Sequence, residues 1–286
     1  MENVAILGFA DPLSSWTHLL AAFAALLGSV ILIRKGRGSS ARIFALALYS
    51  FSLVFLFSMS GVYHLLEKGG AARDVLQRLD HAGIWVLIAG TFTPVHLILF
   101  RGAWRWLILL VVWAIAITGL VLEVIFFTSF PESLILSMFL GLGWMGVLTG
   151  YRFRTAFRGE SMRLLIMGGI YYSIGAVIDF AKWPVFWASI IGPHEIFHVF
   201  VIFGALSHWF FVYEWADHPV ANKITFYIQV FPNSHWVAAA TNDHIRIEAR
   251  SIDELKQLIK KQVKAKYHES IEPEIHLKYS QEEILT

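Results

Sequence analysis

The sequence predicts an all-α membrane protein, a seven-transmembrane-helix bundle in residues 1–219, followed by a small α+β soluble domain in residues 220–286. The first observation is composition: 57% of the 286 residues are apolar, 15% are charged, and the mean hydropathy is +0.60. Soluble domains usually carry about 25% charged residues. The second observation is uneven charge, because residues 1–219 hold 26 charged side chains and residues 220–286 hold 18. This composition excludes a disordered chain, a coiled coil and a nucleic-acid binder, and the lack of cysteine excludes a disulfide-stapled domain.

Seven stretches of residues 1–219 are apolar and long enough to cross about 30 Å of hydrocarbon, given a helical rise of roughly 1.5 Å per residue. They are Trp16–Ile33, Ile43–His64, Ile84–Phe100, Trp106–Phe127, Ser133–Thr149, Leu164–Phe180 and Ala188–Tyr213. Because lipid offers backbone groups no hydrogen-bond partner, each stretch is expected to be a helix. The first stretch is not expected to be a cleaved signal, since Glu2 and Asp11 make its flank acidic and six more spans follow.

The loops between these stretches differ in positive charge, and this difference predicts the orientation of the chain. The first, third and fifth loops hold ten Lys and Arg residues, the other three hold four, and the N-terminal tail holds none. Positive charge is enriched in cytoplasmic loops. We therefore expect the N-terminus on the outer side of the membrane and residues 220–286 in the cytoplasm.

Two histidines four residues apart, His194 and His198, begin the last span directly after Pro193. This spacing stacks two imidazoles on one helix face, where both can bind one zinc ion. The alternative is a pair of core histidines that neighbouring polar groups satisfy. Zinc needs a third protein ligand, and His64 is the best candidate, because the end of span two and the start of span seven lie at the same depth. The start of span three lies at this depth too, so Asp80 is expected beside the ion.

Further polar residues lie within or beside the spans. Ser60 stands four residues before His64 on the same helix face. The remaining ones are expected to be hydrogen-bonded core or interface residues without a catalytic role: His81, His96, Glu123, Asp179 and His208.

Four motifs in this order resemble the hemolysin III proteins, the bacterial branch of the progestin and adiponectin receptor family. They are Ser60–His64 (SGVYH), Leu79–Ile84 (LDHAGI), Ile88–Pro94 (IAGTFTP) and the His194–His198 pair. The resemblance covers roughly residues 12–215. It implies a multi-pass protein of the bacterial inner membrane with Zn²⁺ held by the three histidines named above. It also implies polar places for Ser60 and Asp80 around a zinc-bound water, and ceramidase-like hydrolysis of a lipid amide or ester in membrane lipid homeostasis.

The expected mechanism gives Asp80 and Ser60 the catalytic roles. Zinc would lower the pKa of its water from about 15.7 to about 7 and polarise a substrate carbonyl. Asp80 would accept the proton of that water, and Ser60 would hydrogen-bond the developing oxyanion. The alternative for Asp80 is an N-cap of the third span, and the alternative for Ser60 is polar packing. The expected substrate class is a membrane lipid such as a sphingolipid, since lipid reaches such a site sideways.

Glu195 completes a literal His-Glu-x-x-His string, which is the zincin signature. An intramembrane metalloprotease would use Glu195 as its base, but it would also need a distal ligand such as an aspartate in a Leu-Asp-Gly context. The only Leu-Asp in the chain is Leu79-Asp80, and His81 follows it. We therefore expect Glu195 to cap the last span or to face the interface.

Residues 220–286 have the pattern of a β-β-β-α-β module. Residues 223–231 alternate in polarity, and the further expected strands are Trp236–Ala240, Ile245–Ala249 and Glu274–Tyr279. Turns are expected at Pro232–Ser234 and at Asn242-Asp243. Ser251–Glu254 forms a capping box, and the helix after it has one apolar face: Leu255, Leu258, Ile259 and Val263. The module carries no catalytic motif, so contact with a protein partner or a second copy of the chain is its expected role.

Two other function classes compete with the hydrolase. A non-enzymatic receptor or regulator would use the same ligands for a structural zinc, whereas a catalytic zinc keeps one position open for water. A pore-forming haemolysin is disfavoured, because the spans lack a continuous polar face.

Overall fold

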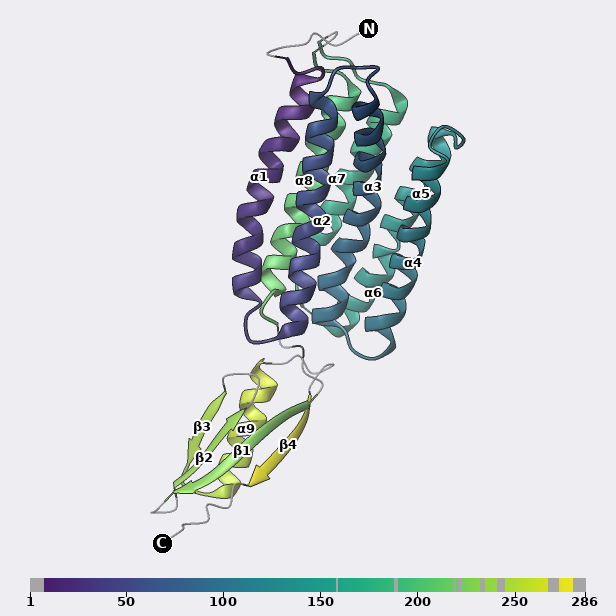
Figure 1. The fold of residues 1–286 in the computed structure, drawn as a ribbon. Coiled ribbons are helices and arrows are strands. Elements are labelled where there is room, and N and C mark those ends of the chain that lie inside the picture. Colours follow the sequence, from purple (N-terminus) through teal and green to yellow (C-terminus); the bar gives the residue numbers. More distant parts are fainter. Residues whose placement is uncertain are drawn as a thin grey trace.

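The computed structural model contains seven helical segments that are long and apolar enough to cross a membrane, as the sequence predicts (Figure 1). It describes residues 8–157, 159–187, 190–218, 220, 223–231, 235–240, 245–266 and 273–279. The spans are α1 (Pro12–Lys35), α2 (Ser40–Leu65), α3 (Ala71–Pro94) with the π-helix η1 (Val95–Leu99), α4 (Ala103–Ile125), α5 (Glu132–Trp144) with α6 (Gly146–Ala156), α7 (Arg163–Ala181) and α8 (Pro193–Trp215).

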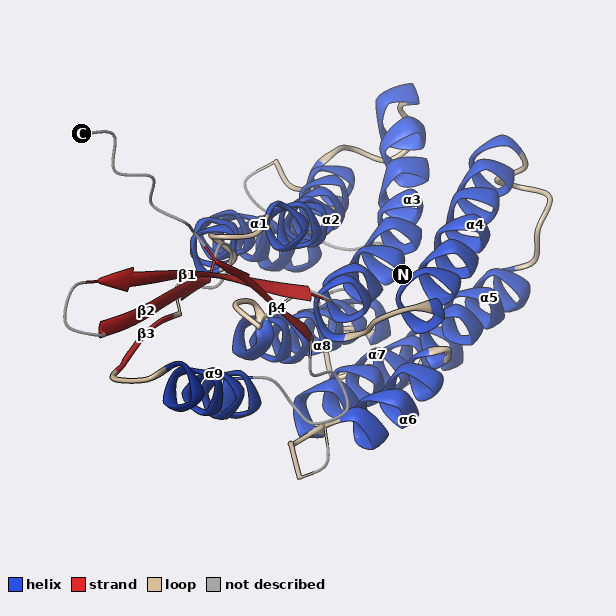
Figure 2. Ribbon diagram, turned by 90° about the horizontal axis from the view of Figure 1, so that it is seen from below, coloured by secondary structure: helices blue, strands red, loops and turns tan. Residues whose placement is uncertain are grey.

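The spans form a closed bundle in which neighbours in the chain are mostly neighbours in space. Contacts run from α1 through α2, α3 and α4 to α5, then to α7 and α8, and α8 returns to α1. Figure 2, which looks along the bundle, shows α8 beside both α1 and α7. The C-terminal end of α2 and the beginning of α8 lie at the same end of the bundle, which is the end that carries the N-terminus of the chain (Figure 1).

Helix α3 begins well before the apolar stretch that predicts it. The helix starts at Ala71 with Gly70 as its N-cap, although the hydropathy of this span rises only at Ile84. Asp80 consequently lies inside the helix, and the alternative that Asp80 is the N-cap of span three is wrong. The physical reason is that helical hydrogen bonds continue through the polar turns at the membrane boundary, where side chains still find polar partners.

Helices α7 and α8 pack through glycines that receive rings from the partner helix. A Cβ at Gly168 would overlap the imidazole of His208, and a Cβ at Gly204 would lie 2.8 Å from the ring of Tyr172. Farther along, a Cβ at Gly175 would lie 2.7 Å from Cβ of Phe200 and 3.3 Å from the ring of Phe197. Small residues let transmembrane helices approach closely. This row of ring-on-glycine contacts brings the last turn of α7 against the first turn of α8.

Arginines hold the chain that leaves α8 against the opposite end of the bundle. Arg42 donates from Nη1 to the carbonyl oxygens of Asp217 (2.9 Å) and His218 (3.2 Å). Arg105 donates to the carbonyl oxygen of Val220 over 3.2 Å. The soluble module is thus connected at the end of the bundle that is remote from the N-terminus (Figure 1).

The C-terminal module contains the four strands and the helix that the sequence predicts. They are β1 (Lys223–Phe231), β2 (His235–Ala240), β3 (Arg246–Ala249), α9 (Ile252–Lys266) and β4 (Glu274–Tyr279). The strand order is β3-β2-β1-β4, with β4 parallel to β1 and the other pairs antiparallel. Leu255, Ile259 and Val263 of α9 are buried in one core with the apolar face of the sheet. The Ser251 hydroxyl caps α9 by accepting from the Glu254 amide at 3.2 Å. The turns predicted at Pro232–Ser234 and Asn242-Asp243 lie outside the described residues.

Candidate metal centre

Three imidazoles from the end of α2 and the start of α8 converge at the N-terminal end of the bundle. The Nε2 atom of His194 lies 3.2 Å from Nε2 of His64 and 3.1 Å from Nε2 of His198. Ligand atoms of all three lie within 4.8 Å of one another, so the group could hold a metal ion. These are the three residues that the sequence predicts as metal ligands.

Two of these imidazoles are oriented by carboxylates on their far side. Nδ1 of His64 lies 3.2 Å from Oδ2 of Asp11, and Nδ1 of His194 lies 3.2 Å from Oδ1 of Asp179. Each Nδ1 is placed to donate its proton to the carboxylate, which leaves the lone pair on Nε2, where the rings meet. Histidines that bind metals usually make this kind of outer contact.

The geometry of the Nε2 atoms fits a bound cation. Nε2 atoms that lie 3.1–3.2 Å apart must share either a proton or a metal ion, because two bare lone pairs at this separation repel one another. Four-coordinate zinc with Zn–N distances of roughly 2.0–2.1 Å would separate neighbouring nitrogens by about 3.3 Å. The donor set and the spacing therefore suit a zinc-sized divalent ion.

The three rings differ in their access to the surroundings. His64 and His198 are buried, with 3% and 2% of their surface exposed. The side chain of His194, in contrast, is 42% exposed. The histidine group is therefore accessible from the side of His194.

Asp11 joins the histidine group to the loop between α2 and α3. It accepts a 2.5 Å hydrogen bond from Nη2 of Arg73, and Lys68 lies 3.6 Å away. Its backbone amide donates to the carbonyl oxygen of His64 at 3.0 Å. Burial alone would raise the pKa of the Asp11 carboxyl, but the hydrogen bonds from His64 and Arg73 outweigh burial and lower that pKa well below its usual value. Asp11 is therefore an anion beside the imidazole of His64.

Comparisons with known proteins identify the family of the chain. A family model described as Haemolysin-III related matches residues 9–209, which is more than two thirds of the chain. The chain belongs to the hemolysin III family. It is 29% identical to Hemolysin-3 of Bacillus cereus over 198 residues, 68% of this chain and 87% of that protein. It is 30% identical to the Hemolysin-3 homolog of Bacillus subtilis over 185 residues, 64% of this chain and 82% of that protein.

A plant relative supports the wider kinship with the progestin and adiponectin receptors. The chain is 26% identical to Heptahelical transmembrane protein 1 of Arabidopsis thaliana over 184 residues, 58% of this chain and 55% of that protein. Together with the seven apolar helices, these similarities make the chain an integral multi-pass membrane protein. The matched region ends at residue 209, so the family model does not include the C-terminal module.

Ser60 and Asp80, the predicted catalytic residues of this hemolysin III protein, lie near the histidine group without hydrogen-bonding to it. Ser60 is 1% exposed and stands one turn below His64 on α2. Asp80 is half-buried on α3 and close enough to interact electrostatically with His64 and His194. Among the described residues, the carboxylates that hydrogen-bond the histidines are Asp11 and Asp179 instead.

Sequence reasoning missed three polar residues of this centre. It gave Asp179 no catalytic role, treated Asp11 only as an acidic flank, and did not consider His18, whose ring stacks on that of His198. Asp179 lies at the end of α7, two residues before that helix stops, while Asp11 and His18 lie at and just after the start of α1. These residues lie at the same depth in the bundle as the end of α2 and the start of α8, and comparing the depths of all helix ends would have identified them.

The zincin alternative is not supported by the position of Glu195. Its carboxylate accepts from the backbone amide of Gly192 (2.9 Å) and from the hydroxyl of Ser14 (3.3 Å). Glu195 therefore caps α8, as the sequence predicts.

Three other histidines of the spans have hydrogen-bond partners elsewhere. His81 pairs with Glu123 at 2.6 Å, and His208 pairs with the carbonyl oxygen of Leu165 at 3.1 Å. His96 bonds the carbonyl oxygen of Trp104 at 2.7 Å and the hydroxyl of Thr149 at 2.9 Å. All three are hydrogen-bonded as predicted, but only His96 lies in the core, because His81 and His208 are partly exposed.

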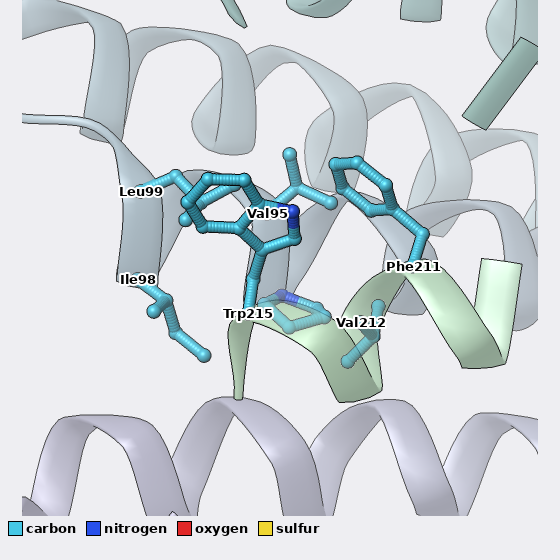
Figure 3. A pocket seen from close by; sticks show the side chains of 7 residues that line it. Val95, Ile98, Leu99, Phe211, Val212 and Trp215 are labelled. Atoms are coloured by element: carbon cyan, nitrogen blue, oxygen red, sulfur yellow. The ribbon is translucent and has the colours of Figure 1, made fainter. Parts of the chain in front are cut away.

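A small recess lies at the other end of the bundle, where η1 meets the last turns of α8 (Figure 3). Its lining residues are Pro94, Val95, Ile98, Leu99, Phe211, Val212 and Trp215. None of these side chains is ionisable, so the recess has no direct part in the chemistry of the histidine group.

Proposed function

We propose that this hemolysin III protein is a zinc-dependent membrane hydrolase that cleaves a lipid amide or ester, as a ceramidase does, in membrane lipid homeostasis. One observation carries the proposal: three imidazole nitrogens from α2 and α8 converge within hydrogen-bond distance, and the group is accessible from the side of His194. A closed fourth position would favour a structural ion, whereas catalytic zinc needs three protein ligands and an accessible fourth place.

Zinc is the ion that this donor set suits best. His64, His194 and His198 offer neutral imidazoles, and the chain has no thiolate to offer. When bound, zinc would supply a water of pKa about 7 and would polarise a carbonyl. Asp11 and Asp179 would orient the rings of His64 and His194 from behind.

Asp80 is the proposed proton acceptor. Its carboxylate lies within electrostatic reach of His64 and His194, and no hydrogen bond to another described residue occupies it. Such a carboxylate is free to take a proton from an attacking water and pass it to the leaving amine or alcohol. Ser60, one turn from His64, would donate its hydroxyl proton to the oxygen that gains charge during attack.

The site's position favours a membrane lipid as substrate. The histidine group lies where α2 ends and α8 begins, in a bundle that exposes many large apolar side chains, so lipid amide and ester bonds at the membrane boundary would be within its reach. Following the charge bias of the loops, this end faces the periplasm and the C-terminal module lies in the cytoplasm.

The test is a turnover assay with purified protein in lipid nanodiscs. Metal content is measured first, and the protein is then incubated with ceramides, other N-acyl lipids and phospholipids, with and without a chelator. His194→Ala should abolish zinc binding and turnover. Asp80→Ala should keep zinc and lose at least about a hundredfold in rate. Asp74→Ala, which removes an exposed carboxylate from the same helix, is the matched control and should leave the rate unchanged.

Two results would reject the proposal. Turnover that survives His194→Ala or chelation would remove zinc from the reaction. Stoichiometric zinc without turnover of any lipid in the panel would favour a structural ion in a receptor or regulator.

A further inference from the structure

Among the residues that the structure describes, no carboxylate makes the contact to His198 that orients the other two ligands. Nδ1 of His64 faces Asp11 and Nδ1 of His194 faces Asp179. Nδ1 of His198 lies near the backbone of Ser14 without completing a hydrogen bond of normal geometry among the described residues. An imidazole that must direct Nε2 at an ion needs its ring plane fixed in some other way.

A fourth imidazole, that of His18 on α1, lies flat against His198. The two ring centroids are 3.8 Å apart and the ring planes differ by 24°. Nε2 of His18 lies 3.4 Å from the backbone carbonyl oxygen of His198. His18 is 2% exposed, and its ligand atoms do not belong to the group of three that could hold the metal. It therefore touches a ligand without being one.

Helix α1 is fixed in the position that this stacking requires. The hydroxyl of Ser15 donates to the carbonyl oxygen of Gly61 at 2.7 Å, and Gly61 lies directly against Leu19. The edge of Phe57 contacts the ring of His18 with centroids 5.1 Å apart. The imidazole of His18 is thus held between α2 and α8 with little freedom to turn.

We propose that His18 is a positioning residue of the metal centre, whose stacked ring fixes the plane of His198 so that Nε2 points at the ion. This inference rests on the proposed metal centre. A bound cation draws electron density from the imidazole of His198, and an electron-poor ring stacks favourably on a neutral one. Loss of a residue that orients a ligand usually weakens metal binding about ten- to hundredfold.

The experiment uses Co²⁺, whose visible absorption reports the geometry of its ligands. Purified, metal-stripped full-length protein is titrated with Co²⁺, and zinc affinity is measured by competition. His18→Phe keeps a flat ring and removes the hydrogen bond. His18→Leu and His18→Asn remove the ring, and the asparagine retains a hydrogen-bond donor. His96→Leu is the matched control, because His96 is a buried histidine bonded far from the centre.

The expected results distinguish the contribution of the stacked ring from that of the hydrogen bond. His18→Phe should bind zinc within about threefold of the wild type with an unchanged cobalt spectrum. The two ringless variants should bind about tenfold more weakly and with an altered spectrum. His96→Leu should lower the melting temperature and leave both metal readouts unchanged.

Two different failures have different meanings. Wild-type affinity and spectrum in whichever ringless variants fold would overturn the role of His18 and leave the metal centre intact. A wild-type protein that takes up neither cobalt nor zinc would overturn the metal centre itself, and the role of His18 with it.

Discussion

The most informative single change is Asp11→Asn, because it affects stability and metal binding through two different partners. Asparagine keeps an oxygen that can accept from Nδ1 of His64, but it removes the negative charge. Arg73, which donates to Asp11 over 2.5 Å, then lacks its counter-ion. The two side chains are only 7% and 9% exposed, so water cannot replace the lost charge.

The expected magnitudes follow from these environments. Breaking a buried ion pair by removing one partner costs about 3–5 kcal/mol. Arg73 also donates to the carbonyl oxygen of Leu66, so we expect the lower end of this range, about 3 kcal/mol. Zinc affinity should fall about tenfold. The asparagine amide still orients the ring of His64, but it lacks the negative charge with which Asp11 makes this imidazole a stronger ligand.

A second change separates the two effects. In Asp11→Asn with Arg73→Met no buried unpaired charge remains, since Lys68 is half-exposed to solvent, so most of the lost stability should return, while zinc affinity should stay about tenfold reduced. Stability is measured by thermal unfolding followed by circular dichroism, and affinity by competition with a zinc chelator. If Asp11→Asn lost affinity and the double variant regained it, the coupling between Asp11 and His64 would be refuted.

Four further predictions concern other contacts. Asp179→Asn should weaken zinc binding about tenfold with little change in melting temperature, because this carboxylate is partly exposed; an unchanged dissociation constant would contradict its role. Gly168→Ala should lower the melting temperature, since the new Cβ overlaps a ring of α8; a stable variant would mean that the helices pack more loosely. The chain has no cysteine, so in intact cells a membrane-impermeant thiol reagent should label Ser129→Cys and spare Lys261→Cys, and the reverse pattern would invert the orientation. Ile259→Ala should destabilise the C-terminal module by about 2–4 kcal/mol in urea unfolding, while a parallel loss of zinc binding would show that module and bundle fold together.

The sequence was sufficient for the features that depend on local pattern. Apolar length predicted the seven spans, and alternation predicted β1 in the module. The i, i+4 spacing of His194 and His198 predicted two ligands, and helix depth predicted His64 as the third.

Features that depend on how helices approach one another were not predictable in the same way. The partner of His194 is Asp179 because α7 and α8 pack closely through glycine. His18 reaches His198 because α1 closes the bundle against α8. Hydropathy also placed the start of span three too late, since it records apolar length and not the extent of the helix.

The alternation of rings and glycines between α7 and α8 has a consequence for the histidine group. Along α7 from Gly168 towards Asp179, and along α8 from His208 back towards His194, glycines of one helix face side chains of the other in alternation. A slip of one helical turn, about 5.4 Å, would press each ring against a side chain instead of a glycine hydrogen. The distance between Asp179 and His194 is thus set along the whole length of the helix pair, by residues as far away as the opposite half of the membrane.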